Sequence, residues 1–259
     1  MENQEDLKVY RKLRIYNAGI GLLHLGQAIA ILLLSKSFSV PIQTSYLSYD
    51  PITGTSQTLL RTVGHVRLGP LVAVFLLLAA ADHLAISMPG IFDWYVRNLE
   101  RHINYARWIE YFFSASLMLV IIAMLSGIYD LSTLILLFFL NGMMILFGWM
   151  MELHNRTTER VNWTALSFGT LAGLIPWVII GLYFVSAAAE AANGVPKFVY
   201  GIMVSIFIFF SIFAVNMVLQ YRGKGRWGDY LYGEKAYILL SLVAKSALAW
   251  QVFAGTLRK

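Results

Sequence analysis

Seven runs of about 20 or more mostly apolar residues divide the chain, and this pattern constrains the fold more than any other feature. A helix needs about 20 apolar residues to cross the hydrocarbon core of a bilayer, because each residue rises about 1.5 Å. Only 13% of the residues are charged, about half the share of a soluble domain, so much of the surface must face lipid. We therefore predict an all-α membrane protein with seven transmembrane helices, at residues 12–34, 64–88, 104–126, 131–150, 162–186, 197–220 and 235–257.

The basic residues are distributed unequally between the two sides of these helices. Cytoplasmic loops of membrane proteins carry an excess of lysine and arginine, which predicts a cytoplasmic N-terminus and an extracellular C-terminus. Of the 20 basic residues, Lys245 lies within a predicted helix. Those assigned to the inner side are Lys8, Arg11, Lys12, Arg14, Arg97, Arg101, Arg107, Arg156, Arg160, Arg222, Lys224, Arg226 and Lys235, and those assigned to the outer side are Lys36, Arg61, Arg67, Lys197, Arg258 and Lys259.

The connection at residues 35–63 is the longest and lies on the predicted extracellular side. It is rich in Ser, Thr and Tyr, and Asp50-Pro51 and Thr53-Gly54 are turn signals. This composition favours an extracellular β-hairpin between helices one and two, with a flexible loop as the alternative. Because no soluble domain or repeat is present, residues 1–259 are predicted to form a single seven-helix membrane domain.

Several classes of function have no support in the sequence. The chain has no cysteine, which excludes disulfides and cysteine-based metal sites. It contains no phosphate-binding glycine loop, no nucleophile elbow and no HExxH motif, so we expect no enzymatic activity. The net charge of +6 is concentrated in short loops, where it sets topology, and we expect no nucleic-acid partner.

Lys245 and Glu110 are ionisable residues inside predicted helices, and such residues usually mark function. Lys245 lies about 15 Å from the inner end of the seventh helix and Glu110 about 9 Å from that of the third, at 1.5 Å per residue. A buried ammonium requires either an ion pair or covalent neutralisation. A structural Lys–Glu pair and a lysine that forms a Schiff base with an aldehyde therefore both remain open.

Other polar residues fall at a similar depth. His24 and Gln27 share one helix face, and His83 lies near the inner end of the second helix. We expect the histidines to accept protons or hydrogen bonds in a polar cavity, and a metal site is disfavoured because no third ligand is evident. Arg107 lies one helical turn before Glu110 and can share its face.

Seven spans, a lysine in the middle of the seventh and a carboxylate on the third together resemble the microbial rhodopsins. The inner N-terminus makes the chain most similar to the heliorhodopsins, a branch with inverted orientation, and the resemblance covers nearly the whole chain. It implies that Lys245 carries retinal as a protonated Schiff base, that Glu110 is its counterion, and that Ser241 replaces the second counterion of pumps. The other residues that the resemblance implies around the chromophore are Ser114, Tyr111, Asn141, Trp177, Phe210 and Trp250.

The resemblance also implies a function: a light-sensing photoreceptor in the cell membrane, with all-trans-retinal in the dark and a slow photocycle. It implies a proton-accepting cavity around His24, Gln27, His83 and Arg107, and a homodimer in which the hairpin takes part. The signalling partner is unknown. Ile121 stands where pumps place a carboxyl proton donor, which disfavours pumping. The alternatives are a light-gated channel or pump on the same scaffold and a retinal-free membrane interaction protein.

Overall fold

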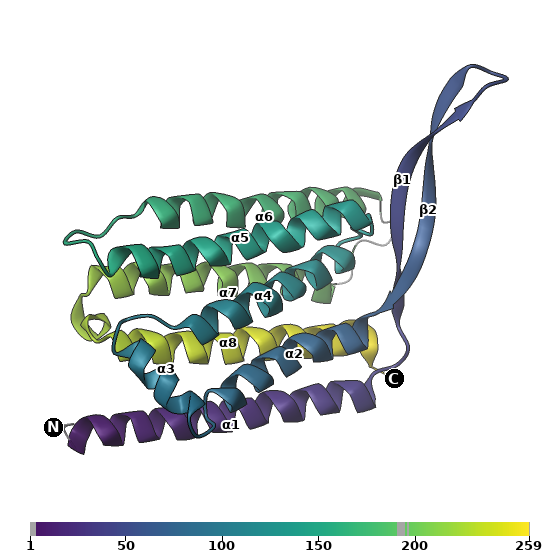
Figure 1. Ribbon diagram of the computed structural model, residues 1–259. Coiled ribbons are helices and arrows are strands. Elements are labelled where there is room, and N and C mark those ends of the chain that lie inside the picture. Colours follow the sequence, from purple (N-terminus) through teal and green to yellow (C-terminus); the bar gives the residue numbers. More distant parts are fainter. Residues whose placement is uncertain (1–3, 191–194, 196, 259) are drawn as a thin grey trace.

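The computed structural model describes residues 4–190, 195 and 197–258, and it is a bundle of long helices (Figure 1). Seven of the helices in this part of the chain are long and apolar enough to cross a membrane, which confirms the predicted fold. Lys259, assigned above to the outer side, lies outside the described residues. The seven are α1 (Gln4–Leu34), α2 (Leu68–Ala85), α4 (Tyr105–Leu125), α5 (Leu131–Asn155), α6 (Thr164–Glu190), α7 (Lys197–Arg222) and α8 (Tyr230–Val252), and α8 continues into the π-helical turn η2 (Phe253–Leu257).

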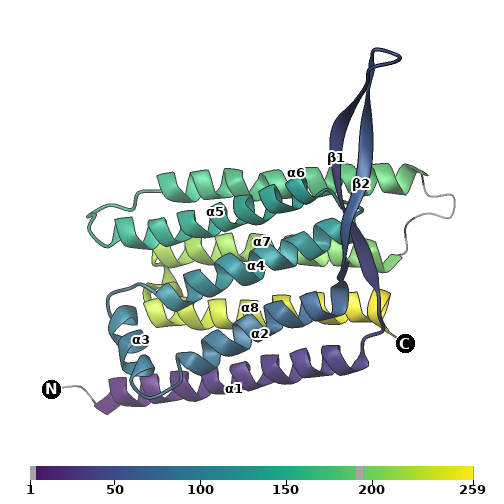
Figure 2. The ribbon, with the colours of Figure 1, turned by 45° about the vertical axis from the view of Figure 1, so that its right-hand side comes forward.

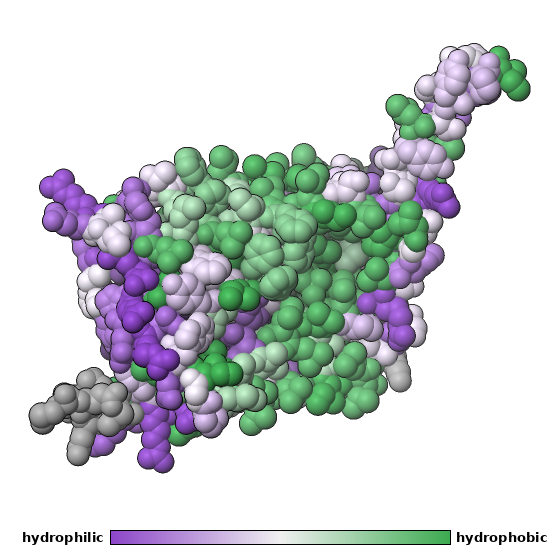
Figure 3. Space-filling model, in the orientation of Figure 1, coloured by the Kyte–Doolittle hydropathy of each residue, from purple (hydrophilic) through white to green (hydrophobic). Residues whose placement is uncertain are grey.

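The surface of the bundle is divided along the helix axes. Apolar residues cover its middle, and hydrophilic residues gather at the end that carries the N-terminus and around the base of the hairpin (Figure 3). An apolar band between two polar ends matches the hydrocarbon core of a bilayer between its headgroup regions. The chain is therefore a multi-pass membrane protein.

The predicted hairpin is confirmed. Strands β1 (Ser39–Asp50) and β2 (Thr55–Arg67) pair antiparallel, run across the ends of the helices and extend past α6 (Figures 1 and 2). At its turn, Asp50 accepts hydrogen bonds from the Ile52 amide (2.9 Å) and the Thr53 hydroxyl (2.8 Å), which lower the pKa of Asp50. Gly54 completes the turn with φ +66°, a conformation that glycine adopts without strain.

The base of the hairpin is fixed to the bundle. Val40 and Ile42 are buried, and the Gln43 amide donates to the Tyr129 carbonyl (2.8 Å) in the loop between α4 and α5. The strand continues to Arg67, so the prediction that a transmembrane helix begins at residue 64 was four residues early.

Two short helices lie at the opposite end, where the N-terminus is. The helix α3 (Ile91–Leu99) crosses the ends of the long helices, and the 3₁₀ helix η1 (Gly225–Gly228) lies between α7 and α8 (Figure 1). The helix α3 was not predicted from the sequence, because nine residues are too few to span a bilayer and the charges of this segment resemble those of a loop. Its buried face includes Tyr95 and Leu99, which pack against other buried apolar residues of the bundle.

Three long helices begin with a side chain that caps a free backbone amide. Asn104 accepts from the Arg107 amide (3.1 Å) at α4, Asp130 from the Thr133 amide (2.8 Å) at α5, and Asp229 from the Leu231 amide (2.8 Å) at α8. These caps fix where α4 and α8 begin, and α4 and α8 carry Glu110 and Lys245.

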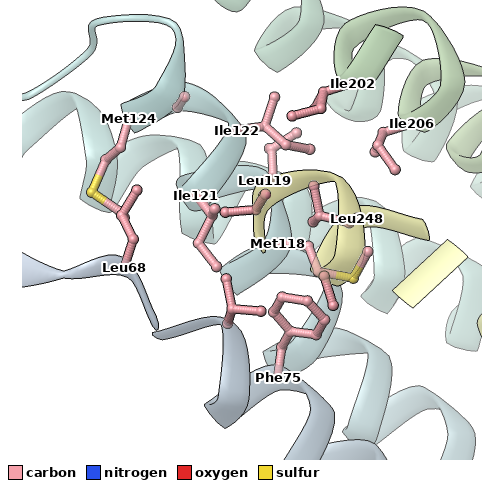
Figure 4. Packing of buried hydrophobic residues seen from close by; sticks show 14 of the residues in the cluster. Leu68, Phe75, Met118, Leu119, Ile121, Ile122, Met124, Ile202, Ile206 and Leu248 are labelled. Atoms are coloured by element: carbon pink, nitrogen blue, oxygen red, sulfur yellow. The ribbon is translucent and has the colours of Figure 1, made fainter. Parts of the chain in front are cut away.

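The apolar core fills the half of the bundle next to the hairpin. It joins residues of all seven long helices in one cluster. Figure 4 labels ten of its members, which lie close together in the interior and are all apolar: Leu68, Phe75, Met118, Leu119, Ile121, Ile122, Met124, Ile202, Ile206 and Leu248.

We expect Gly148→Ala to destabilise the protein. A Cβ at Gly148 would lie 2.6 Å from the ring of Trp108, which cannot move freely because its Nε1 donates to Glu152 (2.6 Å). Overpacking of this kind costs about 1–3 kcal/mol. The measurement is the thermal unfolding midpoint of retinal-free protein in detergent. Gly201→Ala is the matched control, because its Cβ would meet nothing within 4 Å. Equal midpoints for the two variants would contradict the prediction.

Candidate functional site

Lys245 is buried at the middle of α8 and has two polar partners. Its Nζ lies 2.9 Å from Oε2 of Glu110 on α4 and donates to the Ser241 hydroxyl at 2.7 Å. The side chain of Lys245 is 3% exposed and that of Glu110 is 5% exposed. Nζ also lies 5.0 Å from the centre of the Tyr111 ring, whose face attracts a cation. The ion pair between α4 and α8 therefore satisfies the ammonium without help from solvent.

Two acceptors beside this pair have no partner among the described residues. They are the second carboxylate oxygen of Glu110, Oε1, and the hydroxyl of Ser114, which lies one helical turn further along α4. Both are buried, and an unsatisfied buried polar atom is costly. The pair thus keeps unused hydrogen-bonding capacity on the side of Glu110.

A mostly apolar cavity includes Lys245 in its wall. Its volume is about 120 Å³. Aromatic rings and methionines dominate the wall, and Gly148 and Gly169 leave two places without a side chain. The lining residues that matter for an apolar ligand are Trp108, Tyr111, Met118, Met144, Phe210, Phe213, Met217 and Tyr237.

These residues fit a long conjugated aldehyde such as retinal. The amine of Lys245 can condense with an aldehyde, Glu110 can neutralise the positive charge that remains, and rings can pack against a polyene. The cavity is smaller than typical ligand sites, which measure roughly 300–1,000 Å³. The three flexible methionines of its wall can move aside as a ligand enters.

The structure brings some of the predicted chromophore residues to the cavity and not others. Ser114, Tyr111, Phe210 and Ser241 line it together with Lys245. Three lie outside the lining: Trp177 packs edge-on against Phe210, Asn141 donates to Ser116 (3.2 Å), and Trp250 packs on Phe253 with 39% of its surface exposed.

His24 and His83 lie side by side, as the hypothesis of a shared polar cavity requires. Their rings are nearly parallel, with centres 6.0 Å apart, and both are buried. His83 Nδ1 pairs with the side-chain oxygen of Asn17 (2.8 Å), whereas neither nitrogen of His24 nor Oε1 of Gln27 has a partner among the described residues. In the same part of the chain, no three His, Cys, Asp or Glu residues are grouped as metal ligands.

Arg107 belongs to a different cluster, so its predicted place in the histidine cavity was wrong. Its guanidinium forms ion pairs with Glu152 on α5 and Glu234 on α8, and all three side chains are buried. Asn104 joins the cluster by donating to Glu234 (2.7 Å). The reason is geometric: the three-residue spacing permits Arg107 to lie near Glu110, but two carboxylates from other helices bind it instead.

Glu152 and Glu234 were not predicted as site residues, because the predicted spans were too short at the ends that carry them. The fourth predicted span ended at residue 150 and the seventh began at residue 235, whereas α5 continues to Asn155 and α8 begins at Tyr230. Each carboxylate was therefore counted as part of a loop. The available signal was Arg107, since a basic residue inside a span requires a partner.

The comparison with protein families gives one match. The family model described as Heliorhodopsin matches residues 13–257, nearly the whole chain. No curated protein matches the sequence.

The Lys245–Glu110 pair should behave as an energetic unit. Removing one partner leaves an uncompensated buried charge, which costs about 3–5 kcal/mol, whereas removing both leaves none. In retinal-free protein we expect Lys245→Met and Glu110→Gln each to lower the unfolding midpoint. The midpoint of the double variant should be well above the value that the sum of the two single losses predicts. Additive losses would show that the two side chains do not interact.

Proposed function

The chain belongs to the heliorhodopsin family, and from this premise we propose a light-sensing photoreceptor with a slow photocycle and no net ion transport. Family membership makes it a retinal-binding photoreceptor of the microbial rhodopsin type. The observation that carries the finer proposal is the buried Lys245–Glu110 pair, whose lysine lies in the wall of an apolar cavity. The family is not a classical enzyme family.

In this proposal, all-trans-retinal is linked to Nζ of Lys245 in the dark. Retinal supplies the absorption of visible light and a light-driven change of shape. Glu110 stays ionised and holds the positive charge and the proton on the Lys245 nitrogen. A protonated Schiff base would keep a single N–H on this nitrogen, and Glu110 and Ser241, which both accept from Nζ of the free lysine, are the two acceptors available to it. Tyr111 offers its ring face to the charge.

We propose that the proton then leaves the Lys245 nitrogen for the cavity around His24 and His83. His24 on α1 and His83 on α2 lie on helices that contact α8, which carries Lys245, and His24 has two ring nitrogens without a partner among the described residues. A neutral imidazole has one acceptor nitrogen, so His24 can take the proton. Asn17 holds His83 in place beside it.

The distribution of polar groups supports a photocycle without net transport. From Lys245 toward the hairpin, the buried polar side chains are the neutral Ser116, Asn141 and Ser126. Most of the interior there is the apolar cluster of Figure 4, which includes Ile121, Ile122 and Leu248, and none of its side chains can bind or pass on a proton. A proton that moves between Lys245 and the histidines therefore stays on one side of this barrier and returns.

The orientation in the membrane follows from charge. The end of the bundle that carries the N-terminus also carries α3 with Arg97 and the loops with Arg101, Arg156, Arg160 and Lys224. The excess of basic residues there supports a cytoplasmic N-terminus and an extracellular hairpin.

The hairpin supports a homodimer. A lone two-stranded hairpin is marginally stable in water, yet this one extends past the bundle with Leu47, Ile52 and Leu60 exposed by 74%, 93% and 65%. Exposed apolar residues on such an extension are covered at low cost by a second copy of the chain.

The first test is the absorption spectrum of protein supplied with all-trans-retinal. We expect a visible band that hydroxylamine removes, and no band in a folded Lys245→Ala variant, because the nitrogen that carries the chromophore is gone. Glu110→Gln should shift the band, since the negative charge beside the chromophore disappears. A folded wild-type protein without a visible band would leave Lys245 as a structural ion-pair partner.

Illumination separates the photoreceptor from the channel or pump. With the band present, we expect no photocurrent and no lasting pH change in proteoliposomes, because the apolar cluster blocks the route toward the hairpin. A light-dependent current would overturn the absence of transport and leave retinal binding intact.

Shortening the hairpin should abolish the dimer. We would remove residues 46–59 and join Ser45 to Leu60, which are paired across the strands, through Asn-Gly, a favoured two-residue turn. Light scattering of the detergent-solubilised protein should show the mass of two chains for the wild type and of one for the variant. Leu47→Ser with Leu60→Ser keeps the length and should weaken the dimer. A folded, shortened chain that remains a dimer would contradict this role.

A further inference from the structure

A second, polar hollow lies at the end of the bundle that carries the N-terminus. Its volume is about 470 Å³, within the range of small-molecule sites, roughly 300–1,000 Å³. Three segments that are distant in sequence form its wall: the residues after α3, the end of α5 and the connection from α7 to α8. The wall includes Glu100, Arg101, His102, Glu152, Arg156 and Tyr230.

The wall of the hollow presents two arginines without partners. Arg101 and Arg156 are exposed, and neither forms an ion pair with any residue that the structure describes. The floor is different, because Glu152 is buried and its oxygens accept from Arg107, Trp108 and the Asn104 amide. Arg107 is shared between Glu152 and Glu234, so the floor keeps a buried negative charge. At the exposed wall, the two free guanidinium groups outnumber the carboxylate of Glu100.

The backbone at the hollow is strained at one residue. His102 has φ +56° and is the single non-glycine residue with positive φ in the described part of the chain. Its ring stacks on Tyr230, with centres 4.8 Å apart, and so lies in the wall. Strain of this kind costs about 1–3 kcal/mol and is concentrated at functional sites.

We propose that this hollow binds a soluble anion that carries a phosphate group. A phosphate monoester has two negative charges near neutral pH, which match Arg101 and Arg156, and guanidinium groups bind phosphate through paired hydrogen bonds. His102 adds a third donor. The wall is built from loops at the ends of α3, α5 and α7, which favours a ligand from the aqueous phase over a lipid headgroup.

A series of direct contacts between residues connects the hollow to the Lys245 site. Tyr230 donates to Glu152 (3.4 Å), Glu152 pairs with Arg107, and Arg107 lies 4.0 Å from the centre of the Tyr237 ring. The Tyr111 hydroxyl donates to the Tyr237 carbonyl (3.0 Å), and Tyr111 faces Lys245. A ligand in the hollow is therefore in contact with the same network of residues as the proposed chromophore site.

The test is equilibrium dialysis of radiolabelled inorganic phosphate with purified protein in uncharged detergent, without retinal. We expect saturable binding, weakened roughly tenfold or more in Arg101→Gln/Arg156→Gln, since each substitution removes a charged hydrogen bond to the phosphate. Arg97→Gln/Arg160→Gln is the matched control, because it removes the same charge from exposed residues outside the hollow. Glu100→Gln should tighten binding, because it removes a negative charge from the rim.

Two results would overturn the proposal. The first is no saturable binding by folded wild-type protein at millimolar phosphate, and the second is an equal loss in both double variants. Nanodiscs identify the source of the phosphate group. Binding that persists in both neutral and phosphatidylglycerol-containing discs supports a soluble ligand, whereas loss of binding in the anionic discs would assign the hollow to a lipid headgroup.

Discussion

A lysine ammonium in the middle of a membrane helix is tolerated only when another charge compensates it. Here Glu110 provides that charge, and the rest of the bundle is arranged around the pair. The helix α4 carries the carboxylate and α8 carries the amine, so both helices must be held at one depth and one rotation. Their N-caps, Asn104 and Asp229, set where each begins.

The Arg107 cluster strengthens the same alignment. Arg107 lies three residues before Glu110 on α4, and Glu234 lies eleven residues before Lys245 on α8. The two ion pairs therefore join the same two helices at two levels, and Glu152 ties α5 to them. The Tyr111 hydroxyl donates to the carbonyl of Tyr237, which lies between Glu234 and Lys245 on α8. Because a rotation of either helix that broke one pair would strain the other, we expect a change at Lys245 to act on the N-terminal end of the bundle.

The sequence predicted the parts of the fold that depend on hydropathy, and the structure adds the parts that depend on packing. Seven apolar runs and the Ser/Thr/Tyr-rich loop identified the helices and the hairpin correctly. The nine residues of α3 could not be recognised, because a short helix on a membrane surface has the composition of a loop. Spacing alone suggested that Arg107 faces Glu110, but only the structure places Glu152 and Glu234 closer. The family resemblance placed Trp250 near the chromophore, yet a position in the sequence does not fix the face of a helix, and its ring lies outside the cavity wall.

The two halves of the interior differ in a way that bears on how a light signal can leave the protein. Next to the hairpin, α1, α2, α4, α7 and α8 pack through Ile31, Phe75, Ile122, Ile206 and Leu248, with no ionisable group among them. Toward the N-terminus, α1 and α2 bury histidines, α5 and α8 bury carboxylates, and α4 buries Glu110 and Arg107. Charge movement at Lys245 acts strongly on buried charges nearby and weakly on apolar side chains, because the interaction requires a charge or dipole at both ends. In the proposed photoreceptor we therefore expect the response to light to be directed toward the N-terminal end, where α3, the connection between α7 and α8, and the polar hollow lie.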